Sequence, residues 1–265
     1  MTKYWKEDFV YAWKHFTTPS RPSPSELEYM KQRILEKGKD AKILILGSTP
    51  EYRNLCGELG LPVTLIDFNK TSYEVLKGLV DNVPEETLVE DNWISVKLKE
   101  KFDIILGDNV VNVMPLPDMK AFIENLSKLL AENGLLFTRN YIRYEGEEYT
   151  PEKAIEEYRR EGKDWPFQAG TLRNFSLAGY NFDTQMVMLR DIWKGITRIH
   201  DKGLITDEEF KEYVNLSLDR EGGFCIPLKE ESEKWHEEFF KEDDVFYATE
   251  PWMKKNLPVF VYTTK

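Results

Sequence analysis

Short apolar runs alternate with amphipathic stretches through the middle of the chain. The run at residues 43–46 is continuous, and those at 63–66, 94–96, 102–106 and 135–138 are mainly apolar, as expected for buried parallel strands. Helices are predicted between them, from residue 50, over 70–80 and over 119–130, and in the last of these the apolar positions recur on one side. Strand and helix alternate at least four times, which predicts an α/β fold with a mostly parallel sheet and right-handed crossovers.

The segment before the first strand is expected to be helical. Aromatic residues are frequent in a predicted helix that ends at His15, and the Pro-rich stretch TTPSRPSPS breaks it. The spacing of Ser25 and Glu28 matches a capping box, so a second helix is predicted over residues 26–37. We therefore expect an N-terminal helical cap over residues 1–40.

The alternating pattern stops after the fifth apolar run. Asn133 and Gly134 are expected to end the helix over 119–130, since this pair is typical of a helix C-terminus. Residues 143–243 have the pattern of charged helices joined by loops, and the last 21 residues that of two strands joined by a short loop. The expected division is a core (41–142 and 244–265) with a mainly helical insertion (143–243).

Residues 41–67 predict, in order, a strand, a tight turn, the start of a helix and a second strand. This order of elements forms a crevice for a nucleotide-containing ligand. Gly47 follows the first strand directly, and without a Cβ it lets a ligand approach the backbone. Thr49 is a good N-cap and Pro50 suits the first helical position, so free N–H groups should point into the crevice. Asp67 ends the next strand about 20 residues after the glycine, the spacing at which a carboxylate accepts hydrogen bonds from ribose hydroxyls. Capping of the following helix is the alternative role of Asp67.

Composition narrows the class of protein. The 265 residues are 41% hydrophobic and 13% aromatic, enough to fill a core. With 36 basic and 47 acidic residues the net charge is −11, which repels polyanions and makes nucleic acid a poor candidate partner. No apolar run has transmembrane length and the start of the chain is too charged for a secretory signal, so a cytoplasmic location is expected. Cys56 and Cys225 are expected to be reduced thiols.

The ordered segments ILILGSTPEYR, VTLIDFN, EDNWISV, FDIILGDNVVNVMP and LLAENGLLFTRNYI resemble those of the class I S-adenosylmethionine-dependent methyltransferases. The resemblance covers about residues 41–142 and 244–265. It implies a Rossmann-like sheet of seven strands with an antiparallel last strand and helices on both faces. It also implies S-adenosylmethionine (SAM) as the cofactor.

The resemblance assigns roles to particular residues. Gly47 would pass the methionine portion of the cofactor, Asp67 would hold the ribose, and Asp108 with Asn109 would face the transferable methyl group. The full set of expected cofactor contacts is Trp13, Arg21, Gly47, Ser48, Thr49, Asp67, Phe68, Asn69, Asn92, Trp93, Asp108 and Asn109.

The glycine loop departs from the common family pattern and takes a variant form, GxTPExR. Ile45 stands where an acid is usual, and Thr49 and Glu51 stand where further glycines are usual. Arg53 or Arg21 would then grip the carboxylate of the cofactor. The alternative for each arginine is a structural ion pair.

The function implied is methyl transfer to a small molecule, with the insertion over the substrate. Asp108 is the first candidate to orient or deprotonate the acceptor, followed by Tyr141 and His15. Tyr11, Trp13 and His15 are candidates for a lid over the cofactor, and packing in the core is the alternative for this aromatic segment. Two other functions stay open: a non-catalytic module that binds SAM or a nucleotide, and an NAD-dependent oxidoreductase. The scattered histidines predict no metal site, and the oligomeric state is not predicted.

Overall fold

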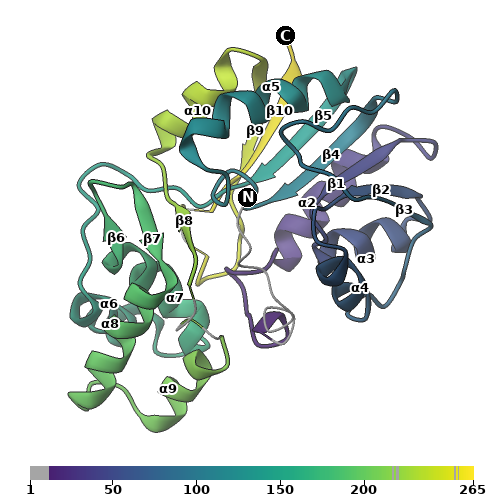
Figure 1. Cartoon of the computed structure of the whole chain (residues 1–265). Coiled ribbons are helices and arrows are strands. Elements are labelled where there is room, and N and C mark those ends of the chain that lie inside the picture. Colours follow the sequence, from purple (N-terminus) through teal and green to yellow (C-terminus); the bar gives the residue numbers. More distant parts are fainter. Residues whose placement is uncertain (1–11, 217, 219–220, 254, 256) are drawn as a thin grey trace.

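The computed structural model describes residues 12–216, 218, 221–253, 255 and 257–265 (Figure 1). Within these residues, seven strands form one sheet in the order β3-β2-β1-β4-β5-β10-β9. β10 pairs antiparallel with both β5 and β9, whereas β1 to β5 pair in parallel. The predicted fold class, mostly parallel with an antiparallel last strand, is confirmed. The strands are β1 (Ile43–Leu46), β2 (Val63–Ile66), β3 (Glu86–Val89), β4 (Phe102–Asp108), β5 (Leu130–Arg139), β9 (Phe240–Phe246) and β10 (Val259–Thr264).

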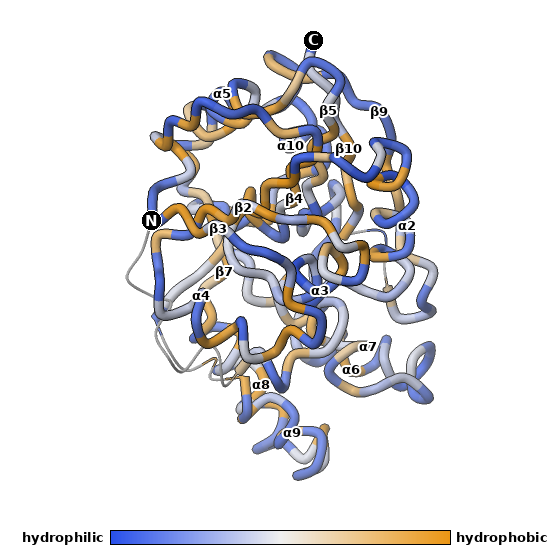
Figure 2. Tube along the Cα trace, turned by 90° about the vertical axis from the view of Figure 1, so that its right-hand side faces the viewer, coloured by the Kyte–Doolittle hydropathy of each residue, from blue (hydrophilic) through white to orange (hydrophobic). Residues whose placement is uncertain are grey.

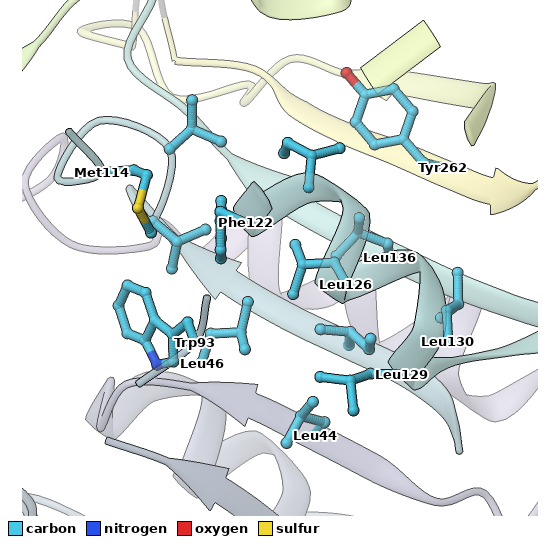
Figure 3. Close-up of a cluster of buried hydrophobic side chains, with 14 of the residues drawn as sticks. Leu44, Leu46, Trp93, Met114, Phe122, Leu126, Leu129, Leu130, Leu136 and Tyr262 are labelled. Atoms are coloured by element: carbon cyan, nitrogen blue, oxygen red, sulfur yellow. The ribbon is translucent and has the colours of Figure 1, made fainter. Parts of the chain in front are cut away.

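Helices cover both faces of this sheet because alternate residues of its strands point to opposite sides. In β1, Leu44 and Leu46 belong to the apolar cluster of α5, part of which is drawn in Figure 3. Ile43 and Ile45 pack on the other face with α2 and α3. The helices of the core are α2 (Pro24–Leu35), α3 (Pro50–Glu58), α4 (Lys70–Lys77), the short 3₁₀ helix η1 (Leu116–Asp118), α5 (Met119–Leu129) and α10 (Lys229–Glu237).

Between β5 and α10 the chain forms a separate layer beside the carboxyl ends of the parallel strands (Figure 1). We call residues 143–228 the lid. The lid has its own buried cluster, which includes Phe167, Phe175 and Ile196. Its elements are α6 (Pro151–Glu157), the π-helix η2 (Tyr158–Gly162), α7 (Phe167–Ala178), β6 (Tyr180–Asn181), β7 (Met186–Met188), α8 (Leu189–Asp201), α9 (Asp207–Val214) and β8 (Gly223–Cys225).

The lid differs in two respects from the sequence-based division. Its strands β6, β7 and β8 form a small antiparallel sheet that the sequence pattern did not predict, because each has only two or three residues. Residue 243, the predicted end of the insertion, falls inside β9, which belongs to the main sheet. The charged sequence FKEDDVF of β9 resembles that of the lid helices, and in Figure 2 this strand is mostly hydrophilic, whereas β2 and β4 are mostly hydrophobic.

Three predicted local features are wrong. The capping box of α2 uses Ser23 and Glu26, so this helix begins two residues before the predicted start. Residues 94–96 form a turn, and the strand that pairs with β2 is β3, eight residues earlier. α5 ends at Leu129, before Asn133 and Gly134, because Leu130 already pairs with Phe102 in the sheet.

The N-terminal segment crosses from the lid to the core. Gln168 of α7 holds it: its Oε1 accepts hydrogen bonds from Thr17 N (2.8 Å) and Oγ1 (2.9 Å), and its Nε2 donates to His15 O. On the other side, Trp252 Nε1 donates to Thr18 Oγ1 at 2.7 Å. Of the predicted helix ending at His15, the part before residue 12, including Tyr11, lies outside the described residues. None of the described helices is long and apolar enough to span a membrane.

Candidate functional site

A cavity of about 280 Å³ lies where the carboxyl ends of the parallel strands face the lid. Open α/β sheets bind ligands at this edge, because loops from several strands meet there. Three groups of residues line it: the strand ends of the core, the N-terminal segment and the lid. The core residues are Leu46, Gly47, Ser48, Thr49, Asp67, Phe68, Asn69, Ser72, Leu76, Trp93, Asp108, Asn109, Asn112 and Val113.

Gly47 lines the cavity with its backbone, because it has no side chain. Its φ is +83°, in the left-handed region that favours glycine, and its N–H donates to Ile66 O at 2.9 Å. A Cβ at this position would stand 3.5 Å from the indole of Trp93. α3 begins at Pro50 as predicted, and Thr49 is its N-cap residue without a capping side-chain hydrogen bond. The hydroxyl of Thr49 is therefore not used by the helix.

The carboxylate of Asp67 is oriented by two donors. Ser48 Oγ donates to Oδ2 at 2.6 Å, and the backbone N–H of Asn69 donates to Oδ1 at 2.9 Å. Burial raises the pKa of Asp67 above its usual range, although both hydrogen bonds act in the opposite direction. The N-cap of α4 is Asn69, whose side chain accepts from Ser72 N. The alternative role of Asp67 as the cap of this helix is therefore wrong.

Of Asn92 and Trp93, both among the expected cofactor contacts, the structure brings one to the cavity. Trp93 lines it, and its Nε1 donates to Ile66 O at 2.7 Å, which fixes the indole at one end of the core cluster beside Leu46 (Figure 3). Asn92 does not line the cavity, because its Oδ1 accepts from Ile94 N within the turn after β3. Phe68 lies on the cavity wall as well.

Asp108, at the end of β4, belongs to a buried ionic network. Arg139 Nη1 donates to Asp108 Oδ1 at 2.9 Å, while Arg139 Nε donates to Glu26 Oε1 at 2.9 Å. Burial raises the pKa of Asp108 to about 6, and the guanidinium acts in the opposite direction. Arg139 Nη2 also donates to Pro19 O and to Arg21 O, and so ties the N-terminal segment to the end of β5.

Sequence reasoning missed Arg139 and Glu26. The available signal was a charged residue at the end of an otherwise apolar run, LLFTR, since a buried arginine needs acceptors. The neighbouring Asn109 turns the chain away from the sheet with φ +52°, and its N–H donates to Arg139 O at 2.7 Å. Arg139 therefore braces both residues at the end of β4.

Asn112 is a second residue that the sequence did not indicate. Its Oδ1 accepts from Tyr141 N at 2.8 Å, and its Nδ2 donates to Tyr141 O at 2.7 Å and to Cys225 O at 2.8 Å. These bonds connect β8 of the lid and Tyr141, two residues after the end of β5, to the core. Tyr141 lines the cavity, and burial raises its pKa above the usual range, which argues against a proton-accepting role at neutral pH.

Other predicted residues lie away from the cavity or serve the fold. Arg53 is buried and pairs with Glu86 through Nε at 2.7 Å and Nη2 at 2.8 Å. It therefore forms a structural ion pair, the alternative role given for it above. Arg21 pairs with Glu51 and does not line the cavity, and neither does His15. Trp13 does line it, together with Phe16, Pro19 and Ser20 of the N-terminal segment.

The cavity wall is acidic. Among the described residues that line it, the charged side chains are Asp67, Asp108 and Glu221, and no Lys, Arg or His is present. Among these described side chains, a cationic ligand group finds counter-charges and an anionic group finds none, so an anion here depends on backbone N–H groups such as those at the start of α3.

Comparison with known proteins supports the fold. No protein-family model matches the sequence, and the search of curated proteins found no relative. Among solved structures, the methyltransferase CcbJ from Streptomyces caelestis aligns with 98% of this chain and 99% of its own, with a TM-score of 0.59 at 10% identity. The glycopeptide N-methyltransferase MtfA, complexed with S-adenosylhomocysteine, aligns over 91% and 89%, with a TM-score of 0.54 at 10% identity.

A third similar structure belongs to another class. A protein from Rhodobacter sphaeroides, proposed to be a Zn-dependent alcohol dehydrogenase, aligns over 98% of this chain and 99% of its own, with a TM-score of 0.56 at 17% identity. At such identities the comparisons establish the fold alone. The chain has the Rossmann-like fold that is found in SAM-dependent methyltransferases.

Proposed function

We propose that this protein transfers the methyl group of SAM to a small-molecule acceptor. In this proposal, the adenosine lies along Asp67, Phe68 and Trp93, and the methionine portion passes Gly47. The acceptor enters from the lid, which we take as the substrate-binding part of the chain.

The observation that carries the proposal is the charge of the cavity wall together with the convergence of Gly47 and Asp67 on one cavity. A sulfonium is a cation, which this acidic wall accommodates, and a ribose diol matches the two lone-pair positions that remain on Asp67. NAD would instead bring a pyrophosphate with two negative charges, for which the described lining offers backbone N–H groups at the start of α3 and no basic side chain. SAM, with a sulfonium and an ammonium against one carboxylate, is a net cation, so the acidic wall favours SAM over NAD.

SAM, when bound, supplies a methyl carbon that an acceptor lone pair attacks as the carbon–sulfur bond breaks and its electron pair stays on sulfur. The chain contributes alignment and exclusion of water, which account for much of the rate in such displacements. The hydrogen bond from Asn112 to Cys225 holds the lid and the core together, and Arg139 fixes Asp108 at the end of β4. Asp108 orients the acceptor, and its oxygen Oδ2 accepts a proton where the acceptor carries one.

Calorimetry with SAM, S-adenosylhomocysteine (SAH) and NAD⁺ tests the first step. We expect micromolar binding of SAM and SAH and no binding of NAD⁺. Tight binding of NAD⁺ without SAM binding would favour an oxidoreductase and refute the proposal. Formation of SAH over a panel of amines, phenols and carboxylic acids then separates a methyltransferase from a non-catalytic SAM-binding module.

A further inference from the structure

The half of the cavity on the lid side combines an apolar wall with a negative charge. The charged side chain of this half is Glu221, and no Lys, Arg or His lines it in the described part of the chain. A ligand that fills this half therefore buries an apolar body and meets a carboxylate. The apolar members come from α7, α8, β8 and the segments before β8 and β10: Leu172, Leu189, Ile192, Leu218, Phe224 and Leu257.

The start of β8 places Glu221 at the cavity. Gly222 O accepts a hydrogen bond from Leu189 N at 3.0 Å, and Gly223 pairs with Met188 of β7. The backbone that carries Glu221 is therefore held by both β7 and α8. Glu221 itself is exposed and makes no hydrogen bond or ion pair with the described residues. Its carboxylate is available to a ligand.

Asp108 brings a second negative charge from the core side. Asp108 and Glu26 share the one guanidinium of Arg139, so two ionised carboxylates against one cation leave this buried group net negative. Burial raises the pKa of Asp108 to about 6, and at pH 7.5 the group is a carboxylate.

The free oxygen of Asp108 opens to the cavity. Oδ1 receives both hydrogen bonds that the described residues give to this carboxylate, from Arg139 Nη1 at 2.9 Å and from Asn109 Nδ2 at 3.1 Å. Oδ2 is not one of the fully buried atoms without a partner, although the side chain is only 3% exposed. Because Asp108 lines the cavity, Oδ2 is the atom through which a ligand meets its charge.

The cofactor alone does not balance these charges. SAM has a single excess positive charge, whereas the described wall carries the carboxylates of Asp67, Asp108 and Glu221. A neutral acceptor would cover the remaining carboxylates without compensating them, and an anionic acceptor would add repulsion. A cationic acceptor supplies the missing charge.

We propose that the acceptor is a mainly apolar amine, which binds as its ammonium form with the nitrogen toward Asp108 Oδ2, while Glu221 provides the second counter-charge on the lid side. This inference rests on the proposed function for the transfer of a methyl group, but selection of an apolar cation by the cavity does not depend on it.

The methylation of an amine balances with the groups present. The ammonium gives one proton to Asp108 Oδ2, which passes it to solvent. The nitrogen lone pair then bonds to the methyl carbon of SAM as the carbon–sulfur bond breaks and its electron pair stays on sulfur. The products are a methylated ammonium, neutral thioether sulfur in SAH, and the released proton.

Three probes with the same aromatic body and different charges test the proposal: 2-phenylethylamine, 2-phenylethanol and 3-phenylpropionate. Ligand-observed NMR at pH 7.5 measures their affinities with and without saturating SAH. The amine should bind about tenfold more tightly than the alcohol, because a hydrogen bond to a charged group is stronger than a neutral one. The carboxylate should bind most weakly.

Two variants locate the charges that select the amine. Glu221→Gln should weaken the amine by about twofold to fivefold, as expected for an exposed ion pair, and leave the alcohol unchanged. Asp108→Asn should weaken the amine by about tenfold or more, because Oδ2 belongs to a buried carboxylate. Circular dichroism verifies that both variants are folded.

Glu230→Gln is the matched control. Glu230 is also exposed, makes no hydrogen bond or ion pair with the described residues, and does not line the cavity. Its replacement removes the same charge from the protein and should leave all three affinities unchanged, so a general attraction of cations to an acidic protein is separated from the site.

Three results would overturn the proposal: an alcohol or carboxylate that binds as tightly as the amine, an amine affinity that is equal in wild type and Glu221→Gln, or no binding of the amine at millimolar concentration. Calorimetry with SAH judges the proposed function separately. Absent SAH binding with a retained preference for the amine would refute methyl transfer and leave the cation site standing.

Discussion

Replacing Asp67 by Asn tests the proposed ribose contact with almost no change in shape. The carboxylate offers about four lone-pair positions, of which Ser48 Oγ and the Asn69 N–H use two. The remaining two suit the vicinal hydroxyls of a ribose. Asparagine has a single acceptor oxygen, which the Asn69 N–H retains, so its amide nitrogen replaces the acceptor beside Ser48. At least one charge-assisted hydrogen bond to the ribose is lost.

The size of the effect follows from this count. A hydrogen bond to a charged group contributes about 1.5–3 kcal/mol, so losing one should raise the Kd for SAH by roughly 10- to 150-fold. The fold should tolerate the substitution, because Ser48 Oγ can accept from the new amide as readily as it donated to the carboxylate.

Isothermal titration with SAH measures the change, and circular dichroism verifies the fold. Asp118→Asn is the matched control, because Asp118 precedes α5 without a capping side-chain bond and does not line the cavity. It should leave the Kd unchanged. A folded Asp67→Asn protein whose Kd for SAH stays within twofold of wild type would refute the ribose assignment.

Three further substitutions, one of them with a control variant, test buried or strained positions of the core. Arg139→Met leaves the buried carboxylates of Glu26 and Asp108 without their cationic partner. It should lower the free energy of unfolding, measured by urea titration, by about 3–5 kcal/mol. Arg160→Met, which breaks an exposed pair, should leave the urea midpoint unchanged, and equal effects would contradict the network. Burial lowers the pKa of His236 to about 4, so the unfolded state binds a proton at a higher pH than the folded state does. As the pH falls from 6.5 to 4, the free energy of unfolding of wild type should therefore decrease by about 3 kcal/mol relative to His236→Gln. Parallel pH dependences of the two proteins would contradict this prediction. Gly47→Ala should cost about 1–2 kcal/mol in thermal unfolding, because φ is +83°, and an unchanged melting temperature would argue against this strain.

Local pattern predicted the central strands well and the edge strand poorly. The runs at residues 43–46 and 63–66 match β1 and β2, since both faces of a central parallel strand are covered and every residue is apolar or nearly so. β3 lies at the edge of the sheet and is only partly buried, so its sequence ETLV lacks that signal. The apolar run 94–96 instead packs its Val96 into the core from a turn.

The capping box of α2 shows how tertiary contacts choose between equivalent local signals. Both Ser23 with Glu26 and Ser25 with Glu28 match the pattern. The structure uses the first pair, because the buried Glu26 also accepts from Arg139, which lies 113 positions further along the chain. Nothing in a local window distinguishes the two pairs.

The sequence by itself determined the order of strands and helices, the Gly47 turn and the place of Asp67, because each depends on residues close together in the chain. Tertiary structure alone decided which side chains meet in the cavity. The hydrogen bonds from Asn112 to Tyr141 O and Cys225 O join segments more than 25 residues apart, whose approach depends on packing of the lid on the core. Hydrophobic periodicity encodes burial and leaves the partners of a buried polar group undetermined.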